Sequence, residues 1–313
     1  MDDAEAETIA EREREDSLER IRRGGIPLQA EQRLKDLADH DGFFTSDLSV
    51  SEFHLCQQAG LRPVSQVMGS CVYHVGYAGR PYYGGTYGYN VNAIAAELPS
   101  LSHSWNAARE LALSRLRQEA AHCRADAVIG VHITKGAWDF VAGAIEFVAI
   151  GTAIRHEGGP PNPHPVLTGL SVQDYFKLNQ AGYDALGLVG ASTVYYVIPS
   201  VASQQIQRSR MMGPGSQNQE LTDLTQGLYA AREAAMGRVE SAARQLGAAG
   251  VVGVTYEQSI RTYEAEGSFG TGSHRDLQIT LHVMGTAISE PHRTAGAPAP
   301  RGLKVTPVIR LNR

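Results

Sequence analysis

The sequence has few of the features that mark secreted, membrane-spanning or nucleic-acid-binding proteins. Three cysteines in 313 residues are an odd and sparse set, which argues against a disulfide framework and for a reducing compartment. No apolar run approaches the roughly 18 residues that would cross a bilayer, and the densely charged residues 1–23 do not resemble a secretory signal. A net charge of −5 gives no general attraction to nucleic acid. We therefore expect a cytoplasmic protein with no membrane span and no nucleic-acid partner.

The sequence also lacks the common signatures of enzymes. It contains no Gly-x-Ser-x-Gly, His-Glu-x-x-His or paired-carboxylate arrangement. The glycine-rich stretch 266–274 lies between two expected strands, whereas a phosphate cradle would lie between a strand and a helix. That context predicts a hairpin connection. We expect a protein that is not an enzyme.

The chain does contain an internal repeat. LSVSEFHLCQQAG, from residue 48, returns as LSVQDYFKLNQAG from residue 170. The matched ranges are 48–75 with 170–197, 107–131 with 230–254, and 151–154 with 285–288. Three ordered matches at a nearly constant offset indicate a pair of related domains rather than a solenoid.

Each repeat predicts the same order of elements. Ser49 and Ser171 occupy N-cap positions of a short helix, each with an acidic residue three positions later. Gly60 and Gly182 are placed to end that helix in a left-handed conformation. A Val- and Tyr-rich strand follows, then a variable loop, a long helix with an apolar stripe, and two further strands. The predicted fold is α+β, with two tandem β-α-β-β units, each preceded by a short helix.

The composition of the chain predicts five parts. They are a polar helical N-terminal segment (1–44), the first repeat (45–156), a Pro- and Gly-rich linker (157–168), the second repeat (169–290) and a basic tail (291–313). The N-terminal segment could be a solvated helix or an arm that docks on a neighbour. The run LKVTPVIRL (303–311) in the tail could add an edge strand.

Part of each repeat resembles a known family. The run ALSRLRQEAAHCRADAVIGVHI (112–133), closed by EFVAIGTAI (146–154), is similar to the YbjQ family, whose label is heavy-metal binding. The resemblance extends over about residues 62–155 and 184–289. It implies small β-α-β-β subunits of the YbjQ or dodecin type that assemble into rings. The loop between the first strand and the long helix departs from the family pattern.

A candidate metal site lies in the first repeat. Its residues are His54, Cys56, Cys71, His74 and Cys123. Thiolate and imidazole are good ligands for zinc or copper, but the spacings do not place neighbouring members on one face. The second repeat has Phe176, Leu178, Thr193, Tyr196 and Leu246 at the matching positions. These replacements favour a core-packing role for the five residues, because unpaired cysteine is usually buried in the core. The alternative is a zinc or copper site in the first repeat alone.

A second candidate site is the loop at residues 76–90. It carries five tyrosines among glycines, namely Tyr77, Tyr82, Tyr83, Tyr87 and Tyr89. Tyrosine supplies a large contact area at low entropic cost. The loop could therefore face a ligand or a second subunit, or its rings could simply cover the sheet.

These observations predict a non-enzymatic homo-oligomer that acts as a ring-like scaffold or binding protein, with no required cofactor. One alternative is a heavy-metal-binding protein that uses the Cys and His residues of the first repeat. The other is a small-molecule carrier with a pocket between subunits. We also expect Gly130→Val to disrupt packing in the closing strands.

Overall fold

The computed structural model describes residues 3–39, 44–75, 94–137, 143–159, 162–209, 219–266 and 273–291. The five tyrosines of the 76–90 loop and the predicted edge strand at 303–311 lie outside these ranges.

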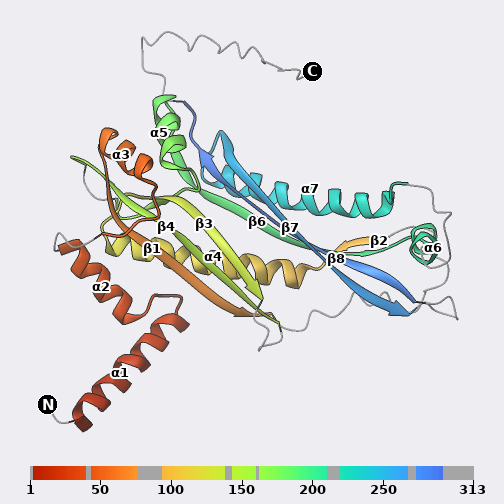
Figure 1. Cartoon of the computed structure of the whole chain (residues 1–313), viewed down its shortest axis with the longest axis horizontal. Coiled ribbons are helices and arrows are strands. Elements are labelled where there is room, and N and C mark those ends of the chain that lie inside the picture. Colours follow the sequence, from red (N-terminus) through yellow and green to blue (C-terminus); the bar gives the residue numbers. More distant parts are fainter. Residues whose placement is uncertain are drawn as a thin grey trace.

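The elements confirm the α+β class (Figure 1). The helices are α1 (Asp3–Arg22), α2 (Leu28–Asp39), α3 (Val50–Gln58), α4 (Pro99–His122), α5 (Val172–Gln180), α6 (Val201–Ser209) and α7 (Thr222–Gln245). The strands are β1 (Leu61–His74), β2 (Ile94–Glu97), β3 (Ala127–Ala137), β4 (Ala144–His156), β5 (Val166–Leu167), β6 (Ala185–Ile198), β7 (Gly250–Glu266) and β8 (Ser273–Ile288). The short elements α6, β2 and β5 were not predicted. No helix within the described ranges is long and apolar enough to cross a membrane.

Among the described residues, two four-stranded sheets carry the fold, in the orders β1-β4-β3-β5 and β2-β6-β8-β7. Helix α4 packs on the first sheet and α7 on the second (Figure 1). Each sheet also takes a strand from the other half of the chain. Strand β2 precedes α4 but pairs with β6, and β5 precedes α5 but pairs in parallel with β3. Exchanged strands therefore join the two halves.

The strand registers of the two sheets correspond. Val67 pairs with Gly151 in the first sheet, and Val189 pairs with Gly285 in the second. Both pairs occupy positions related by the sequence matches of 48–75 with 170–197 and of 151–154 with 285–288. Residues that match in sequence therefore also occupy equivalent positions in the two sheets. Each residue of one half can be compared with its counterpart in the other.

The predicted helix caps are present. The Ser49 side chain accepts a hydrogen bond from the backbone N–H of Glu52 at 3.3 Å, and the Glu52 carboxylate accepts from the backbone N–H of Ser49 at 3.0 Å. Ser171 caps α5 with the first of these two bonds, accepting from the Asp174 N–H at 3.1 Å. Each helix is followed by a glycine with positive φ, as predicted.

Close contact between α4 and the first sheet depends on small residues. The helix presents the fully buried Ala108, Ala112 and Leu116 to the sheet. On β1, a Cβ added at Gly69 would overlap the carbonyl oxygen of Ala112. The many alanines of this helix thus let its backbone approach the strand directly.

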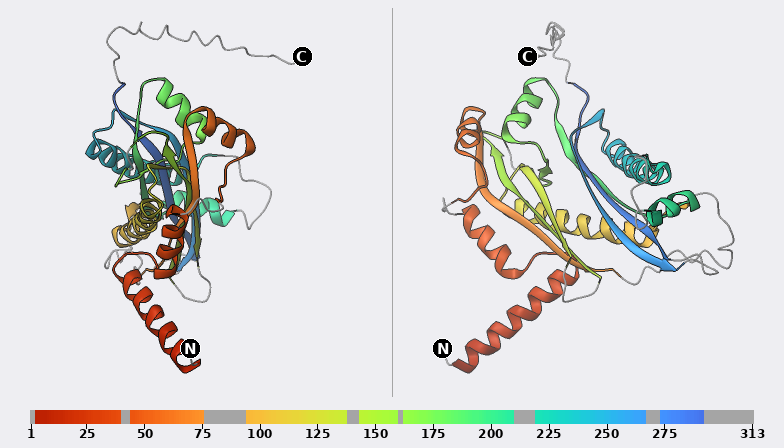
Figure 2. Two further views of the ribbon diagram at one scale, coloured as in Figure 1. Left: turned by 90° about the vertical axis from the view of Figure 1, so that its left-hand side faces the viewer. Right: turned by 45° about the vertical axis from the view of Figure 1, so that its right-hand side comes forward.

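Of the two N-terminal helices, α2 packs against the first half of the fold, while α1 projects away from the sheets (Figure 2). Leu34 of α2 is fully buried in the core of the first half. Arg115 of α4 donates to the carbonyl oxygens of Ile21 at 2.9 Å and Gly25 at 3.0 Å. A third bond, to the carbonyl of Ser70 at 2.6 Å, ties the same guanidinium to β1.

Both closing strand pairs contain a bulge. The β3–β4 register shifts between Ile129 and His132, and the β7–β8 register shifts between Val252 and Thr255. Gly130 lies in the first bulge with φ +65, and a Cβ built there would have no atom within 4 Å. The expectation that Gly130→Val disrupts packing was therefore wrong in its reason, because the constraint is on the backbone.

We predict that substitutions at Gly130 follow the cost of a left-handed backbone. Gly130→Ala should lower the free energy of unfolding by roughly 1–2 kcal/mol. Gly130→Asn should cost less, because asparagine tolerates this conformation, and Gly130→Val should cost most. Chemical denaturation of the three variants tests the order. An asparagine variant as damaging as the valine variant would show instead that side-chain volume decides.

Candidate functional site

A cavity among the described residues lies between the two halves. It has a volume of about 460 Å³, and its lining includes Trp105 of α4, Lys135 of β3, Glu257 and Arg261 of β7, and His282 of β8. We call it the junction pocket. Lys135 forms an ion pair with Glu257, so a charged contact crosses between the sheets beside the pocket.

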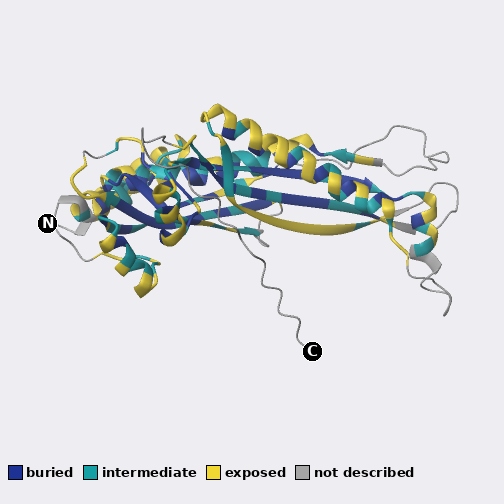
Figure 3. Ribbon diagram, turned by 90° about the horizontal axis from the view of Figure 1, so that it is seen from above, coloured by how far each residue is buried: buried dark blue, intermediate teal, exposed yellow. Residues whose placement is uncertain are grey.

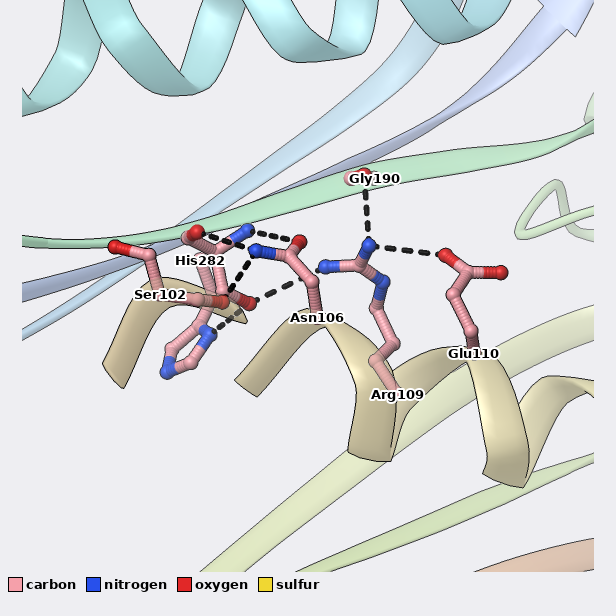
Figure 4. A network of polar contacts seen from close by, with 7 residues as sticks. Ser102, Asn106, Arg109, Glu110, Gly190 and His282 are labelled. Atoms are coloured by element: carbon pink, nitrogen blue, oxygen red, sulfur yellow. Dashed lines mark hydrogen bonds and ion pairs between the residues drawn. The ribbon is translucent and has the colours of Figure 1, made fainter. Parts of the chain in front are cut away.

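One wall of the junction is made where α4 covers the outer edge of β6 (Figure 4). The Asn106 amide donates to the carbonyl of Ser192 at 2.7 Å, and its oxygen accepts from the Ser192 N–H at 2.9 Å. Two residues along β6, the Val194 N–H donates to the Ser102 hydroxyl at 2.9 Å, and its carbonyl accepts from the Leu98 N–H at 2.7 Å. Helix side chains and β2 thus satisfy strand groups that would otherwise stay open.

Arg109 places a charge inside this wall (Figure 4). The residue is 4% exposed. Its guanidinium donates to the Gly190 carbonyl at 2.9 Å, the Ser192 hydroxyl at 3.2 Å and the Glu110 carboxylate at 3.0 Å. Burial lowers the pKa of Arg109, and the neighbouring Glu110 opposes that shift. The buried cation is thereby tied to β6 by bonds that fix the angle between α4 and the second sheet.

His282 completes the network. Its Nδ1 lies 2.8 Å from the Ser192 hydroxyl, and its ring meets Trp105 edge-on with centroids 4.8 Å apart. The Ser192 hydroxyl accepts from Arg109 and keeps one proton and a second lone pair, so it either donates to Nδ1 or accepts from it, according to which ring nitrogen carries the proton. Burial, with smaller contributions from Lys135 and Arg109, lowers the pKa of His282 to about 3. The ring is therefore neutral at physiological pH.

The groups around the pocket are suited to recognition of a ligand. Ser192 is 1% exposed, and its hydroxyl is hydrogen-bonded to both Arg109 and His282, so it is held as a structural link. The pocket offers Trp105, Tyr263, Lys135 and Arg261, aromatic rings and cations suited to a small flat or anionic molecule. Unlike the expected carrier pocket, this cavity lies between two halves of one chain.

The residues of the candidate metal site are dispersed. Cys56 belongs to the cluster around α3 and α5, whereas Cys71 and Cys123 belong to the core under α4. His54 is exposed on α3, 3.0 Å from the Gln58 amide, and His74 is exposed at the end of β1. Core packing thus describes the three cysteines, and it was the wrong expectation for the two histidines.

The environment of the thiols does not fit a metal centre. Burial raises the pKa of Cys56 and of Cys123 to about 11, and it also raises the pKa of Cys71. Burial therefore keeps the thiols protonated in the metal-free chain, and a metal would have to displace these protons to bind the thiolates. Across the part of the chain that the structure describes, no three His, Cys, Asp or Glu side chains gather as metal ligands would.

No pattern in the sequence identified the junction residues. Ser102, Asn106 and Arg109 lie on the long helix at spacings of three and four, so they share one face, but a polar face is usually solvated. Only knowledge that this helix contacts the other repeat would have identified them.

The neutral His282 predicts a pH-dependent stability. Its pKa in the folded chain lies far below the usual 6.5, so the unfolded chain binds the additional proton. Its contribution is complete above pH 6.5 and is lost as the pH falls, by on the order of 1–2 kcal/mol at pH 5. His282→Gln should reduce the loss of unfolding free energy between pH 7.5 and pH 5, measured by denaturant titration. The exposed His103 provides the control, His103→Gln, and equal slopes in both variants would contradict the assignment.

Two comparisons relate the chain to known proteins. Residues 64–157, which span β1 to β4, match the YbjQ family model, described as "putative heavy-metal-binding". The chain is 32% identical over 250 residues to the encapsulin nanocompartment protein Rv1762c of Mycobacterium tuberculosis (strain ATCC 25618 / H37Rv), covering 78% of this chain and 85% of the relative. No solved structure matches the chain. The chain therefore belongs to the family of this mycobacterial protein and carries a YbjQ-type domain in its first half.

Proposed function

We propose that this chain is the subunit of a cytoplasmic, non-enzymatic homo-oligomeric scaffold and acts as a component of a protein nanocompartment. The observation that carries the proposal is the family relationship, which extends over 85% of a relative named as an encapsulin nanocompartment protein. Such a long match includes both halves of the fold and not the YbjQ-type domain alone. Within this proposal, the parts are those expected from the sequence, with repeats at 45–156 and 169–290.

The surface of the chain supports self-association. Large apolar side chains are exposed on the outermost strands of both sheets, namely Met68 and Val72 on β1 and Val254, Tyr256 and Ile260 on β7. An exposed strand edge is a template for pairing with another chain, and proteins normally cover it. Apolar groups on such an edge favour a protein partner over water.

Heavy-metal binding is the second candidate, because the matched family carries that description. Under the scaffold proposal, protein purified without a tag should contain no stoichiometric zinc or copper by elemental mass spectrometry. Cys56→Ala combined with Cys71→Ala should leave the metal content unchanged. One metal per chain, lost in the double variant, would favour the metal-binding function instead.

The scaffold proposal predicts assembly of the purified chain. Native mass spectrometry at micromolar concentration should show species of several copies. Val72→Asp should shift the distribution to smaller species, because it places a charge on an exposed apolar strand. Val201→Asp is the matched control, since Val201 is 40% exposed on α6, outside the sheets. A wild-type chain that is strictly monomeric would contradict the proposal.

A further inference from the structure

The two halves of the chain meet at a strand addition. The Thr168 N–H donates to the Val128 carbonyl of β3 at 2.9 Å. The β3 bulge returns two bonds, from the Val131 N–H to the Thr168 carbonyl at 3.0 Å and from the Gly130 N–H to the Leu170 carbonyl at 2.9 Å. Residues 166–170, which we call the joining segment, thus cover the edge of the first sheet.

The joining segment also forms hydrogen bonds with the second half. The Thr168 hydroxyl lies 3.0 Å from the Thr286 hydroxyl, and the Gly169 N–H donates to Thr286 at 3.1 Å. Both Thr168 and Thr286 are buried. The segment therefore belongs to the second half and reaches across to complete the first.

The first half has the counterpart of this segment. At the constant offset of 122, residues 44–48 correspond to residues 166–170, and we call them the entry segment. Asp47 accepts a hydrogen bond from Thr152, the counterpart of Thr286. The Gln66 N–H of β1 donates to the Thr45 carbonyl at 2.5 Å, which holds the segment beside the outermost strand of the first sheet. It contacts the same threonine position as its counterpart, though through the Asp47 side chain instead of a backbone N–H, and Phe44 is 40% exposed.

The second half has the counterpart of the covered edge. Strand β7 is outermost in its sheet, and no described strand pairs with its outer side. Its bulge contains Gly253 and Val254, which match Gly130 and Val131. Val131 is 4% exposed, whereas Val254 is 45% exposed. Figure 3 shows the long exposed strand along this side of the molecule.

Two further pairs show the same contrast. Val172, just after the joining segment, is 1% exposed, and its counterpart Val50 is 87% exposed. Val194 of β6, covered by α4, is fully buried, while its counterpart Val72 of β1 is 50% exposed. The chain thus contains one complete join, between the joining segment and β3. It also contains both partners of a second join that is not formed within the chain. These are the entry segment, beside the outermost strand β1 of the first sheet, and the edge of the outermost strand β7 of the second sheet.

We propose that the entry segment of one copy adds as a parallel strand to the β7 edge of a second copy, repeating between chains the join that the joining segment makes within one. This inference rests on the proposed function and names its contact surface. The internal join sets the bonds that this contact would contain. The Ser46 N–H of one copy donates to the Val251 carbonyl of the other. In return, the Val254 N–H donates to the Ser46 carbonyl and the Gly253 N–H donates to the Leu48 carbonyl. Because the two surfaces differ, the contact is head-to-tail and forms a closed ring or an open filament.

Disulfide trapping tests the register. Ala127 pairs with Val166 in the internal join, so Phe44→Cys in one chain should lie opposite Gly250→Cys in another, within the reach of a disulfide. A Cβ at Gly250 has open space around it, and the native cysteines are at most 2% exposed. Co-expressed single variants, one carrying a tag, should give a linked heterodimer on mild oxidation. The double variant should give a ladder of higher products.

The control pairs Phe44→Cys with Gly237→Cys, because Gly237 is exposed on α7 and a Cβ there is equally unobstructed. This pair should give at least tenfold less product. Native mass spectrometry of the same samples distinguishes failure of the entry-segment contact from failure of the scaffold proposal. An oligomer without the Phe44–Gly250 link would overturn the entry-segment contact and leave the scaffold proposal intact. A monomer would overturn both. A link within one chain between Gly250→Cys and Val308→Cys would assign the edge to the C-terminal segment and also overturn the proposal.

A pair of proline variants tests the hydrogen bonds without cysteine. Ser46→Pro removes an N–H that the proposed contact uses, whereas Thr45→Pro removes one on the other side of the strand. Ser46→Pro should weaken association at least tenfold, with helical content unchanged by circular dichroism, and Thr45→Pro should leave association near wild type. Equal effects of the two prolines on association would contradict the proposed register.

Discussion

The hydrogen bonds of Thr168 hold the chain together, because they join two sheets that are each incomplete on their own. On one side the Thr168 N–H and carbonyl complete the edge of β3, and on the other its hydroxyl meets Thr286 of β8. An open edge exposes unpaired backbone groups, which are costly to bury and prone to uncontrolled pairing when exposed. A β-α-β-β unit of this type therefore needs a neighbour, and within the chain each half supplies a strand to the other.

The same requirement explains the polar network beside the junction pocket. The outer edge of β6 must also be covered, and α4 covers it with Ser102, Asn106 and Arg109. Burying the Arg109 cation is unfavourable unless it is hydrogen-bonded. Its two terminal nitrogens are bonded to Gly190, Ser192 and Glu110, although its Nε has no partner among the described residues. Its contacts with Gly190 and Ser192 therefore stabilise the native angle between the halves. The neutral His282 fits the same wall, since a charged ring there would lose its hydration on burial and would also be repelled by Lys135 and Arg109.

Local features of this fold could be read from the sequence, whereas contacts between the halves could not. The Ser49 cap and the left-handed Gly60 depend on neighbours a few residues away, and both were predicted. The two-residue strand β5 and the four-residue β2 carry no periodicity, since their strand geometry comes from a partner in the other half. The exposure of His54 and His74 was missed for a related reason: counterpart residues indicate a shared position in the fold, but not a shared environment.

That difference in environment is the central feature of the molecule, because matched positions are buried in one half and exposed in the other. Hydrogen–deuterium exchange tests it most directly at the amides of Gly253 and Val254 in the β7 bulge. If a second copy covers this edge, the protection of both amides should rise with protein concentration, while the Gly130 and Val131 amides should be protected at every concentration. Exchange at Gly253 and Val254 that is fast and independent of concentration, in a chain shown to be oligomeric, would contradict the account.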